Sequence, residues 1–368
     1  MTGRPNLLRG DMPLPAVVIR ESALAHNVRA MAEWTRGHRF ALAPHGKTTM
    51  CPQIFRRQLE AGAWGITAAT SAQAGVCLSA GAKRVVIANQ LIVPANIREL
   101  RNALDGHPDA EIYCLVDSEA GISHLDQHWR GARVPMRVLL EFGRDGWRTG
   151  ARSLAALHNL FEKLRNTGSH IQFAGLEAFE GSASGADQAE AFLLSMIDVA
   201  HQFPSELPLV FSVGGSSYLG ILARTLPRLP ERWTPLVRSG CYVTHDHGIY
   251  EQRQAASAGM DVPHFQPALE LWAVVQSHPE PGLAILSFGK RNASYDLGLP
   301  KPLDLPGCTV TALHDQHAFM TVPADARAEV GDLVRLGISH PCTTFDKWRK
   351  MPLVDDQYNV LDVYETCF

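Results

Sequence analysis

The chain alternates between short apolar runs and longer stretches in which apolar residues recur every three or four positions. The short runs predict strands and the longer stretches predict amphipathic helices, as in βα units around a parallel sheet. The runs that fit strands are Arg39–Ala43, Trp64–Thr67, Arg84–Ala88, Glu111–Val116, Met136–Phe142, Ile171–Glu177, Pro208–Val213 and Pro235–Gly240. Helices are expected between them at Met50–Ala61, Ser71–Ser79, Ala95–Leu104, Ser153–Thr167 and Asp187–Gln202.

Eight strands with intervening helices over about 200 residues are typical of a (β/α)8 TIM barrel. An open, doubly wound sheet alternates in the same way but seldom reaches eight such units. We therefore expect an α/β protein whose main part is a barrel.

The rhythm changes after about residue 255, where strand-like runs follow one another with links rich in Pro and Gly. They predict a smaller, mainly antiparallel β-domain. The runs are Ala268–Gln276, Leu283–Phe288, Cys308–Leu313, Ala318–Val322, Leu333–Ile338 and Asn359–Tyr364. The early strand Ala16–Arg20 precedes the barrel and is free to pair with them. We expect the barrel over residues 18–258, and the β-domain over 259–368 together with 1–17.

Composition narrows the classes of protein. With 368 residues, 46% hydrophobic and 19% charged, the chain suits a globular protein with a large core. A net charge of -3 without a basic block argues against nucleic acid as a partner. No apolar run approaches the roughly 20 residues that span a bilayer. Seven cysteines without a CxxC motif indicate reduced thiols, so we expect a cytoplasmic protein.

Barrel enzymes carry their chemistry at the carboxyl ends of the strands. The first strand is followed by the sequence APHGKTT, which places Lys47 at the barrel mouth. Desolvation there would favour the neutral amine, which is a usable nucleophile. The alternative is a lysine in a surface loop, the commoner fate of a single lysine.

Two glycine-rich turns follow the seventh and eighth strands, GGSS at 214–217 and SGCYVT at 239–244. The N–H groups and serine hydroxyls of such turns bind phosphate, and barrels often hold a phosphate at these two loops. Either turn alone could be only a turn. Together with a lysine at the end of a strand, they indicate pyridoxal phosphate.

Three charged side chains near these turns have two interpretations each. Arg148, after the fifth strand, could reach the cofactor or its substrate, or make a surface ion pair. Glu177 and Glu180, after the sixth strand, could be buried near the site or face solvent.

A second polar cluster lies in the predicted β-domain. His340 and Cys342 are two residues apart, so in an extended segment they share one face and can bind one metal ion, with zinc well suited to these ligands. A core histidine beside a buried cysteine would give the same spacing. Gln316 and His317 are candidates for substrate contacts, or residues at a strand edge. His245 and His247 are weaker candidates as ligands.

The order of the two parts and the lysine after the first strand resemble the fold-type III pyridoxal-phosphate enzymes of the alanine racemase group. PHGKT, GGSS, RSGCYVTHDHGIY, DQHAF and GISHPCTTFDKW resemble the D-serine dehydratase and D-threonine aldolase branch. The nearest likeness is to bacterial amino acid deaminases or D-3-hydroxyaspartate dehydratases. It extends from about residue 14 to Phe368.

The resemblance implies that Lys47 forms the Schiff base with the cofactor. His340 and Cys342 match the metal pair of the branch, which is His and Cys with zinc in the dehydratases and His and Asp with a harder cation in the aldolases. Cys342 therefore favours dehydration and Zn²⁺, with Mn²⁺ or Mg²⁺ as alternatives. The residues implied to hold the cofactor, mainly through backbone N–H groups, are Gly215, Ser216, Gly240 and Cys241, with Tyr242 and Arg148 beside them.

Two positions depart from the pattern of the branch: Ala43, where many members have Arg, and Phe179, where many have Tyr. The expected reaction converts a D-3-hydroxy amino acid, such as D-serine or D-threo-3-hydroxyaspartate, to a 2-oxo acid and ammonia. A homodimer is implied, with neither nucleic acid nor membrane as partner. The alternatives are a D-threonine-type aldolase, an amino acid racemase and a non-catalytic pyridoxal-phosphate-binding protein.

Overall fold

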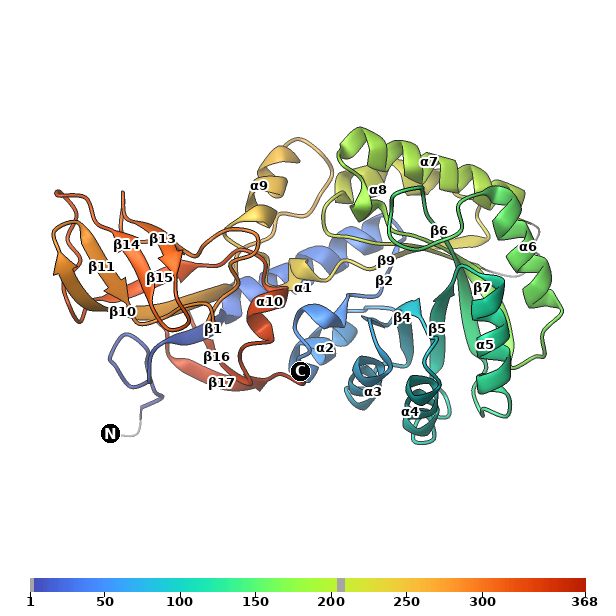
Figure 1. The fold of residues 1–368 in the computed structure, drawn as a ribbon, viewed down its shortest axis with the longest axis horizontal. Coiled ribbons are helices and arrows are strands. Elements are labelled where there is room, and N and C mark those ends of the chain that lie inside the picture. Colours follow the sequence, from blue (N-terminus) through green and yellow to red (C-terminus); the bar gives the residue numbers. More distant parts are fainter. Residues whose placement is uncertain (1–2, 204–208) are drawn as a thin grey trace.

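The computed structural model describes residues 3–203 and 209–368, and these form two sheets with helices around the first (Figure 1). The first sheet is parallel, in the order β2-β9-β8-β7-β6-β5-β4-β3. Its strands are β2 (Ala41–Leu42), β3 (Ile66–Ala68), β4 (Arg84–Gln90), β5 (Glu111–Val116), β6 (Met136–Phe142), β7 (Ile171–Ala178), β8 (Leu209–Val213) and β9 (Trp233–Val237). Pro208, the first residue of one predicted strand, lies outside the described residues.

The parallel sheet bends until its two end strands meet. Trp64 N–H donates to the Leu42 carbonyl oxygen at 2.7 Å, and Thr67 N–H donates to that of Pro44 at 2.8 Å. The predicted barrel is therefore confirmed. The last strand ends at Val237 rather than at the predicted Gly240 because residues 238–240 already form the loop at its carboxyl end.

Helices connect the barrel strands, and local sequence signals fix where several of them begin. The side chains of Thr70, Ser118 and Ser153 accept N-cap hydrogen bonds, and α2 and α4 begin at prolines. The helices are α1 (Glu21–Gly37), α2 (Pro52–Glu60), α3 (Ser71–Ser79), α4 (Pro94–Leu104), α5 (Glu119–Trp129), α6 (Leu154–Arg165), α7 (Ala186–Gln202), α8 (Leu219–Thr225) and α9 (Ile249–Ala256). None of the described helices is long and apolar enough to cross a membrane.

The second sheet is mainly antiparallel, as predicted, and runs along the path β13-β14-β11-β10-β1-β16-β17. Off this path, β15 pairs with β10, and β12 pairs with β15. The strands are β1 (Ala16–Arg20), β10 (Leu269–Glu280), β11 (Leu283–Leu286), β12 (Lys301–Pro302), β13 (Thr309–Leu313), β14 (Ala318–Thr321), β15 (Leu333–Gly337), β16 (Lys350–Val354) and β17 (Val360–Glu365). Strand β1 pairs with β10, which confirms that the early strand joins this sheet. The limits predicted for the two parts stay a prediction.

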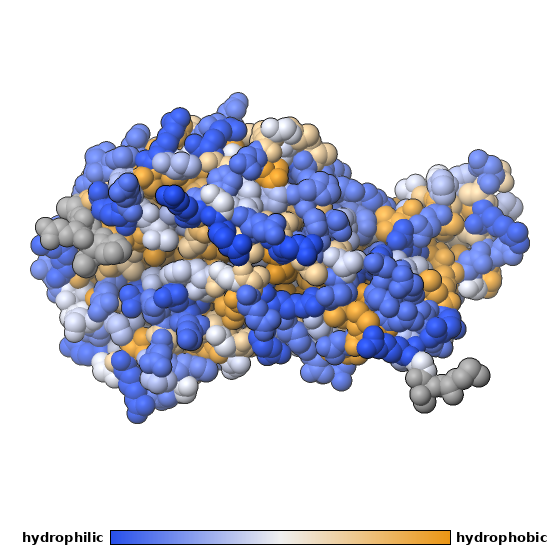
Figure 2. Space-filling model, turned by 180° about the vertical axis from the view of Figure 1, so that it is seen from behind, coloured by the Kyte–Doolittle hydropathy of each residue, from blue (hydrophilic) through white to orange (hydrophobic). Residues whose placement is uncertain are grey.

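The two sheets lie side by side, and α1 runs from the second sheet toward the barrel (Figure 1). The short helix α10 (Cys342–Phe345) belongs to the second part but contacts the turn η1 (Gly46–Thr48) that follows β2. Seen from behind, the surface is mostly hydrophilic, with smaller hydrophobic areas between the polar residues (Figure 2). The junction of the two parts therefore brings segments from both ends of the chain to the barrel mouth.

Candidate active site

Lys47 lies in η1, directly after the first barrel strand. Glycine is needed at position 46, because a Cβ there would lie 2.8 Å from the ring of Phe55. The Lys47 side chain is exposed, so the expected desolvation is wrong: the turn presents this side chain to solvent at the barrel mouth. Its placement at the end of the strand is as predicted.

Positive charge gathers around this turn. Burial lowers the pKa of His45 well below its ordinary value, and the nearby charges of Lys47, Arg238 and Arg148 lower it further. His45 is therefore neutral, and three basic side chains lie around it. Such a concentration of cations at a concave mouth attracts an anionic ligand.

A buried hydrogen bond joins the guanidinium of Arg238, just after β9, to the carboxyl group of Glu177 at the end of β7. Burial raises the pKa of Glu177 to about 8, although the charge of Arg238 opposes this shift. Among the described residues, Arg238 Nε and Glu177 Oε2 have no hydrogen-bond partner. Unpaired buried polar atoms are rare, and these two are available to a bound group. Arg238 was not among the predicted site residues, although a charge inside the apolar run PLVRSG was a signal.

The first glycine-rich turn differs from its expected role. The N–H groups of Gly214 and Gly215 donate to the carboxylate of Glu180, at 3.0 and 3.2 Å. A fully buried carboxylate requires such donors, and this one takes the amides that we had expected to face a phosphate. The Ser239 hydroxyl donates to the Gly215 carbonyl oxygen at 2.7 Å and so links the two glycine-rich turns.

The second glycine-rich turn keeps its amides available. Cys241 and Tyr242 begin the 3-10 turn η4 (Cys241–Val243), and no described residue accepts a hydrogen bond from their N–H groups. Ser216 and Tyr242 line one pocket together with Arg253, whose guanidinium donates to the Ser217 hydroxyl at 2.6 Å. These donors fit the phosphate of the implied cofactor.

Gly240 packs the second glycine-rich turn against η1, the turn that carries Lys47 and is called the lysine turn below. A Cβ at this position would lie 2.6 Å from the His45 carbonyl oxygen and 2.9 Å from Thr48 Oγ1. Its role is close packing of two backbones, which only glycine allows. Tyr242 is buried, and its hydroxyl accepts a hydrogen bond from Gln58 at 3.0 Å.

Arg148 is exposed, and its guanidinium carbon lies 4.5 Å from the centre of the Phe179 ring. The same ring blocks the space beside Gly214, where a Cβ would lie 2.3 Å from it. Phe179 therefore serves as a platform for Arg148 in a cation–π contact and offers no hydroxyl.

The structure brings the two predicted cysteines together. The sulfur atoms of Cys241 and Cys342 are 3.4 Å apart, and Cys342 Sγ is also 3.4 Å from Thr48 Oγ1. The turn with Lys47, the second glycine-rich turn and the segment with His340 and Cys342 thus meet at one place, although they are about 100 to 290 residues apart in the chain.

The segment around His340 is not extended, which corrects our prediction. His340 has a φ of 61°, and Cys342 is the first residue of α10. The buried carboxylate of Asp246 accounts for this shape, because it accepts the His340 N–H at 2.9 Å. The Nδ1 atom of His340 is 2.6 Å from Asp296 Oδ2. Within the part of the chain that the structure describes, no three His, Cys, Asp or Glu side chains lie close enough together to bind one metal ion.

Gln316 and His317 are not brought to this place. They occupy the exposed turn between β13 and β14, in the second sheet (Figure 1). Among the described residues, neither side chain hydrogen-bonds to the lysine turn or the cysteine pair. Their role as substrate contacts stays a prediction.

Comparison with protein families decides the relationship. The model of the family described as "Alanine racemase, N-terminal domain" matches residues 19–244, more than half of the chain. The chain belongs to this family. The fold-type III pyridoxal-phosphate relationship indicated by the motifs is thereby confirmed. A second family model, described as "Putative serine dehydratase domain", matches residues 268–354 of the same chain.

Individual relatives extend over nearly the whole chain. It is 28% identical over 363 residues to D-threonine aldolase from Arthrobacter sp., covering 95% of this chain and 91% of the relative. It is 22% identical over 348 residues to 3-hydroxy-D-aspartate aldolase from Paracoccus denitrificans (strain Pd 1222), covering 91% and 87%.

Solved structures of D-threonine aldolase and a dehydratase share the fold. D-threonine aldolase from Filomicrobium marinum superposes with a TM-score of 0.86 at 23% identity, covering 100% of this chain and 98% of the other. D-threo-3-hydroxyaspartate dehydratase from Delftia sp. HT23 gives 0.75 at 21% identity and covers 99% of both chains. These likenesses extend the fold over both sheets of this family member.

Proposed function

We propose that this protein is a pyridoxal-phosphate- and metal-dependent dehydratase that converts D-3-hydroxy amino acids, such as D-serine or D-threo-3-hydroxyaspartate, to 2-oxo acids and ammonia. The observation that carries the proposal is the contact between Cys342 and Thr48, which sets a thiol beside the lysine turn. Relatives that act on D-3-hydroxy amino acids support the substrate class.

The residues that would hold the cofactor are Lys47, the N–H groups of Cys241 and Tyr242, and Ser216. The cations around His45 complement a phosphate, and unpaired Arg238 Nε is a donor for a further polar atom. Bound there, the cofactor supplies an electron sink for charge at the substrate Cα, and a metal ion supplies a Lewis acid for the departing hydroxide.

Besides holding the cofactor, Lys47 moves a proton during the reaction. Its amine takes the proton from the substrate Cα, and the Cβ–O bond breaks as hydroxide leaves. The enamine product hydrolyses to the 2-oxo acid and ammonia. The exposed Lys47 side chain is free to swing between the cofactor and the Cα position.

Cys342 is the residue that favours dehydration. Hydroxide is a poor leaving group, so breaking the Cβ–O bond needs a Lewis acid at the β-oxygen, and a thiolate selects a soft ion such as zinc over magnesium or manganese. His340 is the second ligand that we assign to this ion, and its Nδ1 contact with Asp296 leaves Nε2 to bind it.

The second candidate function is retro-aldol cleavage to glycine and an aldehyde. It is favoured by the 28% identity to D-threonine aldolase over 95% of the chain. The same Lys47 and metal pair would serve, but the proton removed would come from the β-hydroxyl and the Cα–Cβ bond would break.

The two reactions give different products from the same substrates. The cofactor- and zinc-loaded protein is incubated with D-serine, D-threonine and D-threo-3-hydroxyaspartate, with their L-isomers as controls. We expect equimolar 2-oxo acid and ammonia from the D-isomers. Glycine and aldehyde without ammonia would replace dehydration by aldol cleavage, and loss of optical activity alone would indicate a racemase.

A further inference from the structure

Cys241 has an unused side chain at the centre of the site. Its backbone N–H is assigned to the cofactor, but its sulfur points to Cys342 at 3.4 Å, and Thr48 Oγ1 lies 3.8 Å away. We propose that Cys241 is a second thiolate ligand of the metal ion, so that the ion is held by Cys241, Cys342 and His340. The inference rests on the metal dependence in the proposed function and adds a ligand that the HxC motif, His340 and Cys342, does not contain.

The distance between the two sulfurs fits this role. Two thiolates bound to one zinc ion at about 2.3 Å, in tetrahedral geometry, lie about 3.8 Å apart. The observed 3.4 Å is within a few tenths of an ångström of that spacing. By contrast, Cys77 and Cys114 lie fully buried in the hydrophobic core.

The backbone around the pair is held from both sides. Cys241 follows Gly240, which is packed against the lysine turn, and the Cys241 carbonyl oxygen accepts the His245 N–H at 2.8 Å. Asp246, next in the chain, accepts the His340 N–H. One short segment therefore positions Cys241 and also fixes the start of the motif that carries Cys342.

His340, the proposed nitrogen ligand, does not converge with the two sulfur atoms among the described residues. His340 Nδ1 is engaged with Asp296, an arrangement that orients the ring and leaves Nε2 for a metal ion. Because no three such side chains converge within residues 3–203 and 209–368, binding of the ion has to draw the imidazole toward the sulfur pair.

A Cys2His set has two chemical consequences. Three protein ligands leave the fourth tetrahedral position open, as in catalytic zinc sites, and the β-hydroxyl of the substrate fits there. Two thiolates also strengthen the preference for Zn²⁺ or Co²⁺ over Mn²⁺ and Mg²⁺. Binding releases the protons of both thiols, so no redox step is involved.

Cobalt is the probe that tests this inference. The full-length, cofactor-loaded protein is stripped of metal with a chelator and reloaded with Co²⁺. The thiolate-to-cobalt charge-transfer absorption is then read as the loaded-minus-stripped difference. In Cys241→Ser we expect about half of the wild-type intensity per bound cobalt, because one of two thiolates is lost. Cys342→Ser should behave alike, and Cys77→Ser, which removes a buried thiol elsewhere, should match the wild type.

The outcomes separate this inference from the proposed function. If Cys241→Ser keeps the full absorption while Cys342→Ser loses it, Cys241 is no ligand and only the HxC pair binds the ion. If the wild type shows no thiolate band, the metal site in the proposed function fails as well.

Alkylation gives a second reading that does not depend on the spectrum. Zinc should protect both Cys241 and Cys342 from iodoacetamide, as located by peptide mass spectrometry, and a chelator should restore their labelling. Labelling that requires a reductant, with or without zinc, would mean that the two sulfurs form a disulfide, which would overturn the inference.

Discussion

Asp246 is the residue on which the backbone conformation at His340 depends. It is buried, and its carboxylate accepts N–H groups from Gly248 and Tyr250 at Oδ1 and from His340 at Oδ2, all at 2.9 Å. The sequence places it between two histidines that attract more attention as metal ligands. Its function is to hold backbone, including a His340 conformation with positive φ that a non-glycine residue adopts only when its surroundings impose it.

Replacing Asp246 should therefore weaken metal binding while leaving the cofactor in place. In Asp246→Asn the amide nitrogen cannot accept the His340 N–H, and we expect metal affinity to fall by about 10–100-fold, as for other residues that orient ligands. Competition with a zinc chelator measures it, and the visible spectrum reports retained cofactor. Asp355→Asn is the matched control, because Asp355 accepts the N–H groups of Gln357 and Asn359 in an exposed turn. Equal zinc affinity in the two variants would contradict the assignment.

Glu177 gives the molecule a pH dependence of known sign. Burial raises its pKa from 4.5 to about 8, so the folded state holds a proton that the unfolded chain releases near pH 4.5. Stability from this group is complete below about pH 4.5 and is lost as the pH rises through about 8.

Glu177→Gln should flatten this part of the stability profile, because the amide stays neutral throughout. Urea unfolding of the cofactor-free protein at several pH values between 4.5 and 8 measures the slope in both forms. Parallel profiles of variant and wild type would show that Glu177 does not titrate in this range.

At the scale of elements, the fit between loops decides whether the site assembles. Gly240→Ala would place a Cβ 2.6 Å from the His45 carbonyl oxygen, a backbone atom that cannot swing aside as a side chain can. Overpacking of this kind costs about 1–3 kcal/mol, which corresponds to roughly 5–150-fold weaker cofactor binding if the lysine turn is displaced.

Titration of the cofactor-free variant with pyridoxal phosphate, followed by absorbance, measures this change. Gly37→Ala is the control, because nothing lies within 4 Å of a Cβ at that position. An unchanged dissociation constant in Gly240→Ala would mean that the two turns are not packed as described.

The elements themselves were largely predictable from the sequence, since apolar runs bounded by glycine and proline mark strands and periodic stretches mark helices. Strand β16 was missed because Pro352 interrupts it, and proline is a poor strand signal. What the sequence did not indicate is which polar groups pair once the loops meet. The N–H groups of Gly214 and Gly215 donate to Glu180, and Arg238 donates to Glu177. Buried polar groups need hydrogen-bond partners, and these are the ones within reach in the folded chain.

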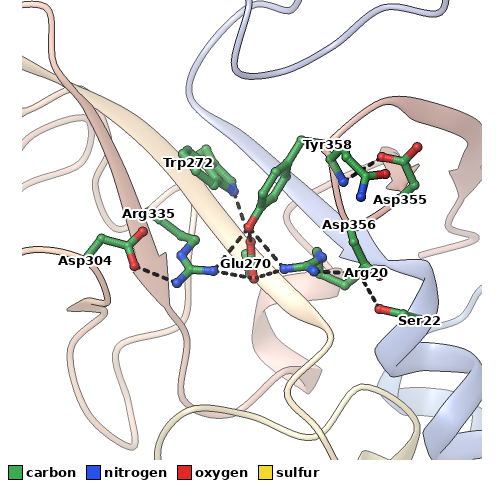
Figure 3. A network of polar contacts seen from close by, with 10 residues as sticks. Arg20, Ser22, Glu270, Trp272, Asp304, Arg335, Asp355, Asp356 and Tyr358 are labelled. Atoms are coloured by element: carbon green, nitrogen blue, oxygen red, sulfur yellow. Dashed lines mark hydrogen bonds and ion pairs between the residues drawn. The ribbon is translucent and has the colours of Figure 1, made fainter.

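At the scale of the whole molecule, one buried carboxylate ties the second sheet together (Figure 3). Glu270 on β10 is 3% exposed and accepts hydrogen bonds from Arg20 on β1, Tyr358 and Trp272, at 3.0 to 3.2 Å. Arg335 on β15 completes an ion pair at 3.5 Å. The network therefore joins the start of the chain to three later segments.

Removing this charge should destabilise the whole protein. Glu270→Gln leaves two arginines facing a neutral amide, and breaking a buried pair costs about 3 kcal/mol or more. Thermal unfolding should show a Tm lower by several degrees. Glu365→Gln, which removes an exposed partner of Lys350, should change stability by less than about 1 kcal/mol. Similar Tm values for both variants would refute a structural role for the network.

Strand β1 also determines the order in which the molecule can be completed. It lies inside the second sheet, antiparallel to β10 and parallel to β16, so that Ile19 pairs with both Leu269 and Leu353. During synthesis this strand is made about 250 residues before β10 and about 330 residues before β16. Until then the apolar segment VVI stays unpaired in the nascent protein, where chaperones can bind it. A chain shortened before β16 would leave one edge of β1 without a partner strand and prone to aggregation.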